Sequence, residues 1–305
     1  MGLKFIEAHK FDIDDFLDNS YFEKFLDTSS EWIEKRTGIL TRQFSNCGND
    51  LMALDLAKKF KNPMQDLDLI ICASFTSKKR MPSISSIVRD ELGGNKHCLC
   101  LDINLACTGF AAGLIIAESY LKMGRRAYIF ASEKISDYMD MTDRRTAILF
   151  GDGAGGVLVE KNEKLWETDI ASFPHEDSLN LDENSFITMD GKKVYRFAVE
   201  EVSNSIRRLL NKNNLRGEDV DKLILHQANE RIINQLIGRL GINKNNSLQN
   251  LEKYGNTSAA SIPLVIAENI DLFKDKEKVI LSGFGAGISL ASILMEWWDG
   301  FKRFT

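Results

Sequence analysis

The 305-residue sequence has only four prolines and four histidines, and no hydrophobic run approaches the ~20 residues of a membrane-spanning helix. Its first 16 residues lack the basic segment followed by an apolar one that marks an export signal. We therefore expect neither a membrane span nor secretion, and predict a cytoplasmic protein. A net charge of −5 argues against general binding of nucleic acid.

Cysteine is also scarce, with five residues at positions 47, 72, 98, 100 and 107. Most of them lie in apolar, strand-like runs, which favours reduced thiols over a disulfide framework. Cys98 and Cys100 are two residues apart, but no second Cys or His pair has the spacing of metal ligands. We therefore expect no metal site.

What the sequence does contain is a weak internal repeat with a spacing near 150 residues. The paired segments are 114–118 with 264–268, 66–73 with 219–226, and 127–133 with 279–285. Strand-like and helical runs alternate in both copies. This pattern predicts two similar α/β halves, residues 1–165 and 166–305, with mostly parallel sheets buried on both faces.

Cys107 lies where a short strand-like run gives way to a helical pattern whose apolar face includes Phe110 and Leu114. The unpaired N–H groups and the positive dipole end of a helix would favour a thiolate there. A buried structural cysteine is the alternative. In α/β proteins, functional residues gather at the carboxyl ends of strands, which is where Cys107 is expected.

Two further residues occupy similar junctions in the second copy. His226 directly follows the apolar run 223–225, and Asn256 precedes the helical segment that mirrors the one after Cys107. Taken alone, His226 would be a core residue and Asn256 a helix cap. Because no Asp or Glu adjoins His226 in the sequence, a Ser-His-Asp hydrolase is disfavoured. Together with Cys107, the two side chains suit chemistry in which both donate hydrogen bonds to a developing oxyanion.

The motifs around these residues are DINLACTGFAAG (102–113), LILHQANERII (223–233) and YGNTSAASIP (254–263). They resemble the three active-site motifs of β-ketoacyl-acyl-carrier-protein synthase III, a family of thiolase-fold condensing enzymes. The similarity continues in order through residues 27–39, 141–156, 188–199 and 283–287, and so covers nearly the whole chain. It implies a thiolase-like five-layer αβαβα fold with two pseudo-duplicated halves, and a homodimer.

The resemblance also implies a ping-pong reaction that requires no metal and no NAD. Cys107 would take an acyl group from acyl-CoA, and malonyl-acyl-carrier protein would lose CO₂ to give an enolate that attacks the acyl group. The product would start a fatty-acid or related acyl chain. The alternative is a thiolase-fold acyltransferase of a specialised pathway that moves an acyl group from CoA or carrier protein to a non-malonyl acceptor.

Family positions imply roles for further residues. Backbone N–H groups of Cys107 and Ala286 would form the oxyanion hole, and Met81 would be a gate residue that reaches the partner subunit's acyl pocket. The residues expected to bind CoA or pantetheine are Trp32, Arg36, Arg144, Phe150, Met189, Gly191, Tyr195, Ala228 and Asn229. Independently of the family, the basic residues Arg207, Arg208, Lys212 and Lys253 suggest a docking face for an acidic carrier protein, with a solvated helix face as the alternative.

One motif is misleading, and two further features depart from the family pattern. Residues 151–156, GDGAGG, satisfy a dinucleotide-binding pattern, but an apolar strand-like run follows where that site needs a helix, so we do not expect NAD binding. The loop at 173–187 is shorter than is usual in the family. Leu290 and Ala291 stand where Trp and Gly are typical. The unbranched side chain of Met81 leads us to expect primers larger than acetyl.

Overall fold

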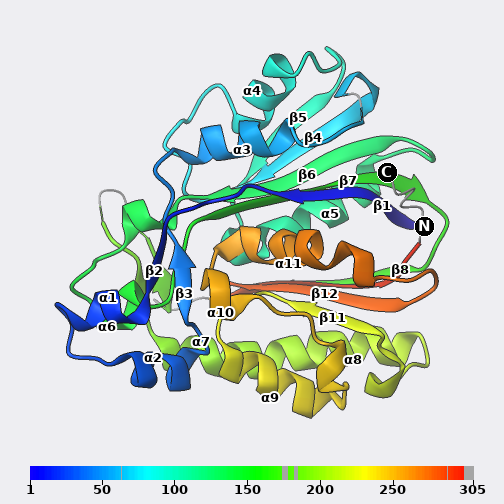
Figure 1. The fold of residues 1–305 in the computed structure, drawn as a ribbon. Helices are drawn as coiled ribbons and strands as arrows, with labels where there is room; N and C mark the ends of the chain where they lie inside the picture. The colour runs from blue at the N-terminus through cyan, green and yellow to red at the C-terminus, as the bar shows by residue number, and fades with distance from the viewer. Residues whose placement is uncertain (63, 174–177, 182–184, 287, 299–305) are drawn as a thin grey trace.

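The computed structural model describes residues 1–62, 64–173, 178–181, 185–286 and 288–298, and it consists of five alternating layers of helices and sheets (Figure 1). Helices α3 (Asn49–Ala57) and α4 (Ile84–Glu91) cover the outer face of the first sheet. Helices α5 (Gly109–Tyr120) and α11 (Ser261–Asn269) lie between the two sheets. Helices α8 (Ser203–Lys212) and α9 (Glu230–Leu240) cover the second sheet. The predicted αβαβα layering is confirmed.

The two sheets have matching strand orders, β1-β7-β6-β4-β5 in the first and β8-β13-β12-β11 in the second. The strands of the first sheet are β1 (Gly2–Lys10), β4 (Leu67–Ala73), β5 (Leu99–Ile103), β6 (Arg126–Glu133) and β7 (Gly153–Asn162). Those of the second are β8 (Trp166–Ser172), β11 (Lys222–Leu225), β12 (Lys278–Gly285) and β13 (Ser289–Glu296). All three sequence repeats fall on equivalent elements, which are β4 with β11, β6 with β12, and α5 with α11.

The prediction of mostly parallel sheets was wrong. Among the described strand pairs of the two sheets, only β4–β5, β4–β6 and β11–β12 are parallel, whereas β1–β7, β6–β7, β12–β13 and β13–β8 are antiparallel. The physical reason is that no crossover helix lies between β6 and β7 or between β12 and β13. Each second strand therefore runs antiparallel to the strand that precedes it. Residues 153–156 already belong to β7, so the glycine-rich segment runs into a strand and not into a helix, as predicted.

The distribution of apolar residues on each helix fits the layer in which the helix lies. On α5 and α11 most side chains are apolar and buried around the whole circumference, as a helix between two sheets requires. Helix α9 instead buries one stripe, Ile232, Ile233, Leu236, Ile237 and Leu240, against the second sheet. Among the described residues, no helix is both long and apolar enough to cross a membrane.

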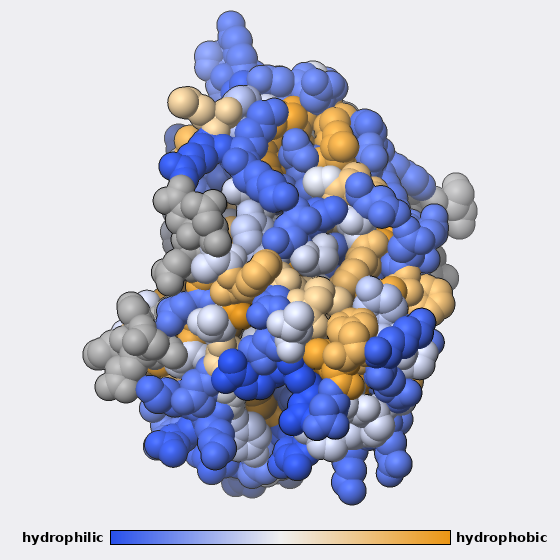
Figure 2. Space-filling model, turned by 90° about the vertical axis from the view of Figure 1, so that its left-hand side faces the viewer, coloured by the Kyte–Doolittle hydropathy of each residue, from blue (hydrophilic) through white to orange (hydrophobic). Residues whose placement is uncertain are grey.

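The remaining elements form one end of the molecule and surround the site. They are β2 (Phe16–Asp18), α1 (Asn19–Glu23), α2 (Ser30–Thr37), β3 (Thr41–Gln43), α6 (Arg144–Ala147), β9 (Leu179–Asn180), β10 (Thr188–Met189), α7 (Gly191–Phe197) and α10 (Leu251–Tyr254). Figure 2 looks onto this end, where hydrophobic side chains gather near the middle of the face and hydrophilic ones surround them. This end therefore combines an apolar middle with a hydrophilic rim.

Candidate active site

Cys107 sits in the short 3₁₀ helix η2 (Ala106–Thr108) that connects β5 to α5. The preceding Ala106 has φ of 43°, a conformation that non-glycine residues rarely adopt. In the second half, Ser258 has φ of 50° at the start of η7 (Ser258–Ala260), just after Asn256 and just before α11. Strained backbone of this kind clusters at functional sites, and here it marks both junctions.

Strand β12 passes directly against Cys107 because glycine leaves room for it. A Cβ atom on Gly285 would lie 2.8 Å from Cys107 Cβ and 3.0 Å from its Sγ, so any larger residue would displace the sulfur. The next residue, Ala286, donates a backbone hydrogen bond toward the thiol. This arrangement brings the two predicted oxyanion-hole residues together. Gly287, the last residue of the GFGAG motif, lies outside the described residues.

The expectation of a resting thiolate at Cys107 was wrong. The residue is only 5% exposed, and burial raises the pKa of the thiol to about 11. The Ser258 hydroxyl and the backbone N–H groups of Ala286 and Cys107 lower this pKa, but they do not offset the loss of solvation. The sulfur is therefore a neutral thiol at neutral pH and must lose its proton during attack.

His226 directly follows the carboxyl end of strand β11 in the second sheet. Its backbone N–H donates to Ser282 O of β12 at 2.9 Å. The ring is 1% exposed, and burial lowers its pKa to about 3, so it is neutral. Its Nδ1 lies 2.8 Å from Ser261 Oγ, which itself accepts the Gln227 backbone N–H at 3.3 Å. With the serine hydroxyl donating to Nδ1, the Nε2–H is left to donate into the site.

Asn256 is held by backbone contacts from both sides. It forms an isolated parallel bridge with Phe150, in which its N–H donates to Leu149 O at 2.9 Å and its O accepts from Gly151 N at 3.1 Å. Its side-chain Oδ1 accepts the Ser258 N–H at 2.9 Å, which fixes the carboxamide so that Nδ2 is the free donor. The sequence alone could not have shown the bridge to Phe150.

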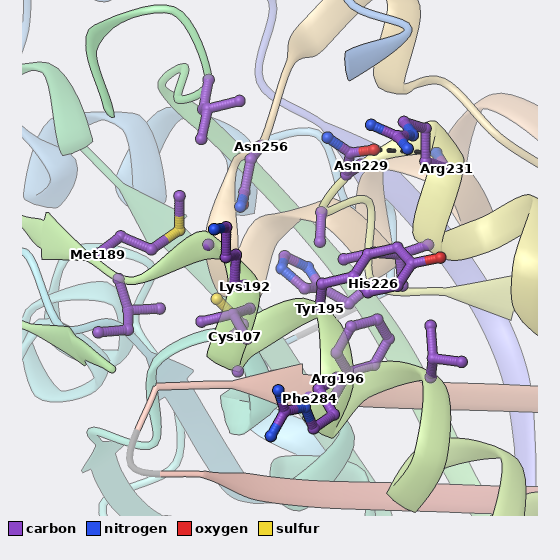
Figure 3. Close-up of a pocket in the computed structure, with 18 of the residues that line it drawn as sticks. Cys107, Met189, Lys192, Tyr195, Arg196, His226, Asn229, Arg231, Asn256 and Phe284 are labelled. Carbon is purple, nitrogen blue, oxygen red and sulfur yellow. Dashed lines mark hydrogen bonds between the residues drawn. The ribbon is translucent and has the colours of Figure 1, made fainter. Parts of the chain in front are cut away.

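The three catalytic candidates line one cavity of about 560 Å³, and Figure 3 shows their side chains around the same space. Its lining includes seven of the nine residues expected to bind CoA or pantetheine, which are Arg36, Phe150, Met189, Gly191, Tyr195, Ala228 and Asn229. The side chain of Asn229 is also structural, because its Oδ1 caps α9 and its Nδ2 donates to Arg36 O at 3.1 Å.

The other two, Trp32 and Arg144, do not line this cavity but adjoin Arg36. The Trp32 indole is 37% exposed, and the guanidinium groups of Arg144 and Arg36 lie 4.8 and 5.6 Å from its ring centroid. An exposed aromatic ring flanked by two guanidinium groups suits a purine carrying phosphates.

A second cavity of about 210 Å³ adjoins Cys107 on its other side. Its walls are mainly apolar and include Phe75, Leu179, Leu181, Ile187 and Ala286. Met81, 84% exposed, lines neither cavity of its own chain. The loop 173–187 is described only in part, since residues 174–177 and 182–184 lie outside the described residues. Leu290 and Ala291 are fully buried in β13.

The basic residues predicted to receive a carrier protein are engaged in contacts within the chain. Arg208 pairs with Asp169 at 2.7 Å, Lys212 with Glu167 at 2.5 Å and Lys253 with Glu268 at 3.0 Å, and Arg207 donates to Arg239 O at 2.8 Å. The mouth of the larger cavity carries other cations that the sequence analysis missed, which are Lys192, Arg196, Arg231 and Arg239. Lys192, Arg196 and Arg231 lie within the matched segments 188–199 and 223–233, and this was their only sequence signal.

Across the part of the chain that the structure describes, no group of three or more His, Cys, Asp or Glu side chains could hold a metal ion. All five cysteines are free.

Comparisons with known proteins agree with this geometry. The family model of 3-oxoacyl-[acyl-carrier-protein] synthase III matches residues 101–174, and the model of its C-terminal part matches residues 210–297. The β-ketoacyl-[acyl-carrier-protein] synthase III of Clostridium botulinum (strain Okra) is 39% identical over 92% of this chain and 94% of its own. A Bacillus anthracis protein of that name is 34% identical, with the same coverage of both chains.

Solved structures give the same result. The 3-oxoacyl-[acyl-carrier-protein] synthase III of Aquifex aeolicus superposes with a TM-score of 0.92 at 35% identity, over 97% of this chain and all of that one. The priming β-ketosynthase of the R1128 polyketide pathway has a TM-score of 0.91 at 27% identity, over 97% and 96%. The chain belongs to the β-ketoacyl-acyl-carrier-protein synthase III family.

Proposed function

We propose that this protein joins an acyl primer from acyl-CoA to malonyl-acyl-carrier protein by decarboxylative Claisen condensation, and so starts an acyl chain. The observation that carries the proposal is the convergence of Cys107, His226 and Asn256 on one cavity. In the first half-reaction, Cys107 Sγ attacks the thioester carbonyl of acyl-CoA. The bond to the CoA sulfur breaks, and CoA leaves as a thiol with the proton that Cys107 gave up. The backbone N–H groups of Cys107 and Ala286 stabilise the oxyanion.

In the second half-reaction, malonyl-acyl-carrier protein loses CO₂ and the bonding electron pair stays as an enolate. The His226 Nε2–H and the Asn256 Nδ2–H donate to the enolate oxygen. The enolate carbon attacks the acyl-Cys107 carbonyl, a carbon–carbon bond forms, and the sulfur leaves and regains a proton. Neutral His226 suits this role, because a donor that keeps its proton stabilises the oxyanion without depending on pH.

The smaller cavity supports a primer larger than acetyl. Its volume of about 210 Å³ exceeds the about 150 Å³ of a protein cavity that accommodates benzene, and its walls are apolar. After incubation with straight and branched acyl-CoAs, intact-mass and peptide analysis should show faster labelling of Cys107 by primers of about four to six carbons than by acetyl. Labelling confined to acetyl-CoA would contradict this expectation. The I187F variant, which narrows the cavity, should shift the preference back toward acetyl.

Release of CO₂ from malonyl-acyl-carrier protein tests the condensation itself. An acyltransferase of a specialised pathway would acylate Cys107 but release no CO₂ from this substrate. The similarity to the R1128 priming enzyme makes a specialised condensation a second candidate, in which CO₂ is still released but the elongated chain enters another pathway. We further propose that the protein acts in the cytoplasm.

A homodimer completes the proposal. Strand β5 is the outer strand of the first sheet, and the apolar side chains of Leu99 and Leu105 near it are 37% and 42% exposed. An exposed strand edge with apolar neighbours favours pairing with a second copy. Met81 would then reach the partner's acyl cavity, as the family resemblance implies. Sedimentation should give twice the 34.5 kDa of one chain, and a monomer would contradict this arrangement.

For the carrier protein, we propose docking at the mouth of the larger cavity, where Arg231 and Arg196 are exposed. The R231E variant should raise the KM for malonyl-acyl-carrier protein by roughly tenfold, because it places like charge against an acidic partner. The matched control is R208E, on the outer helix α8, whose side chain already pairs with Asp169. A larger effect of R208E than of R231E would instead support docking on α8.

A further inference from the structure

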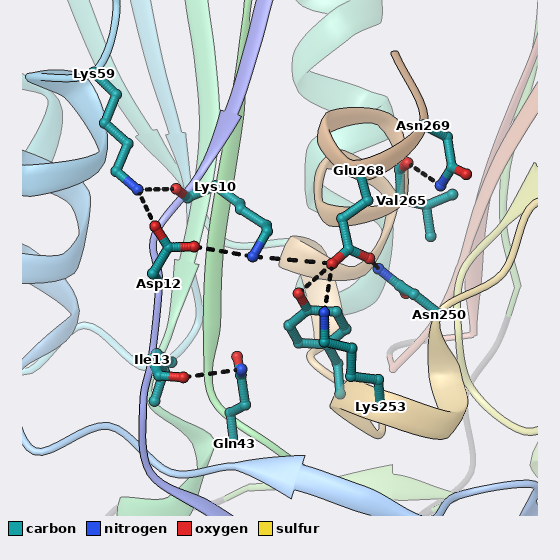
Figure 4. Close-up of polar contacts among 11 residues, drawn as sticks. Lys10, Asp12, Ile13, Gln43, Lys59, Asn250, Lys253, Val265, Glu268 and Asn269 are labelled. Carbon is teal, nitrogen blue, oxygen red and sulfur yellow. Dashed lines mark hydrogen bonds and ion pairs between the residues drawn. The ribbon is translucent and has the colours of Figure 1, made fainter. Parts of the chain in front are cut away.

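The carboxylate of Glu268, near the end of α11, binds three residues of the short segment that precedes Asn256 (Figure 4). Its Oε2 accepts from Asn250 Nδ2 at 3.0 Å, and its Oε1 accepts from Lys253 Nζ at 3.0 Å and from the Tyr254 hydroxyl. Burial alone would raise the pKa of Glu268, but these hydrogen bonds lower it overall, so the group is ionised at neutral pH.

One route from this carboxylate leads to Asn256. Tyr254 is 1% exposed, and only Gly255 separates it from Asn256. Gly255 has φ of +66°, and a Cβ there would lie 2.8 Å from Leu149 O, so the backbone is confined at this point. A shift of Tyr254 is therefore transmitted to Asn256 rather than absorbed between them.

A second route leads to His226. The backbone N–H of Asn250 donates to Gln227 Oε1 at 3.2 Å, and the Gln227 backbone N–H donates to Ser261 Oγ at 3.3 Å. Ser261 Oγ in turn lies 2.8 Å from His226 Nδ1. Gln227 is fully buried and Ser261 is 1% exposed, so these bonds are shielded from water.

The backbone around Cys107 is held by different contacts, and Ser258, which lies beside both its thiol and Asn256, is the link between the two sites. Cys107 lies against Gly285 of β12, and the neighbouring Thr108 hydroxyl is 2.9 Å from Ser289 Oγ. Within the described residues, no hydrogen bond of Glu268 reaches these elements.

From this network we infer that Glu268 is a positioning residue for the second half-reaction. It orients Asn256 through Tyr254, and it orients His226 through Asn250. The rate of Cys107 acylation does not depend on it. The inference rests on the proposed condensation, in which His226 and Asn256 serve the enolate. Glu268 does not touch the substrate, so its effect is confined to the placement of the two donors. Such misplacement by about 1 Å reduces the rate by about 100-fold.

The test measures the two half-reactions separately in the full-length protein. The E268A variant should slow CO₂ release from malonyl-acyl-carrier protein by about 10- to 100-fold, whereas the rate of Cys107 acylation by acyl-CoA, followed by intact mass, stays close to wild type. The E268Q variant should recover most of the loss, since its amide oxygen still accepts from Asn250.

The chain offers a matched control in Glu118, which occupies the equivalent place on α5 and pairs with Lys161. The E118A variant removes a similar ion pair from a similar helix end but should not separate the two rates. Equal losses in both half-reactions of E268A, or no loss in either, would overturn the assignment. Should E268A fail to fold, Y254F gives the same comparison, because it removes the hydroxyl that binds Glu268 with little change of volume.

The same two measurements on the wild-type protein distinguish a failure of the proposed condensation from a failure of the role of Glu268. Acylation of Cys107 without CO₂ release in the wild type would overturn the proposed condensation. Wild-type release of CO₂ together with unchanged release in E268A and Y254F would overturn only the role of Glu268.

Discussion

Replacement of Cys107 by alanine should abolish the acyl-enzyme and lower the rate of condensation by at least ~10³-fold, because among the described residues no other nucleophile lines both cavities beside the oxyanion-hole N–H groups. Intact-mass analysis after incubation with acyl-CoA should show the acyl adduct on the wild type and none on C107A. Decarboxylation of malonyl-acyl-carrier protein should persist in C107A, since the enolate donors remain. An adduct of the same mass on C107A would place the nucleophile elsewhere.

The pH dependence of Cys107 provides an independent check on this prediction. Burial raises the pKa of the thiol to about 11, so at lower pH the reactive thiolate is a minor form that increases tenfold for each pH unit. Alkylation of Cys107 by iodoacetamide should therefore accelerate steadily from about pH 6 to about pH 9, without a plateau. A plateau near neutral pH would show that the thiolate is already the resting form.

The sequence predicted the duplication and the three catalytic candidates from local pattern, whereas the five layers were implied by the family resemblance. Helix α5 could be read from its apolar residues, and the junction at Cys107 from the change of pattern before it. The strand directions could not be predicted in this way, since periodicity does not distinguish a parallel from an antiparallel neighbour. The sequence also could not reveal the thiol pKa, which depends on how completely the surrounding elements exclude water from Cys107.

The carrier-docking prediction shows a second limit. Arg208 and Lys212 form a basic cluster in sequence, yet their partners Asp169 and Glu167 come from β8, about 40 residues earlier. Charge counted along the chain misses such pairing. The cations at the cavity mouth come from separate segments, and Arg196 on α7 and Arg231 on α9 line the same cavity only in the folded chain. The bonds that connect Glu268 to the site also join separate segments, with partners 14 to 35 residues apart.

The two enolate donors should show the opposite pattern to Cys107. N256A and H226A should each slow condensation by about 10²–10³-fold, the typical cost of one oxyanion donor, while Cys107 is still acylated. We expect the acyl-enzyme to accumulate in the mass spectrum while little CO₂ is released. Because burial lowers the pKa of His226 to about 3, the decarboxylation rate of the wild type should show no titration between about pH 5 and about pH 8. A rise through pH 6.5 would instead indicate that His226 acts as a base that must lose a proton, and loss of acylation in N256A would assign that residue to the first half-reaction.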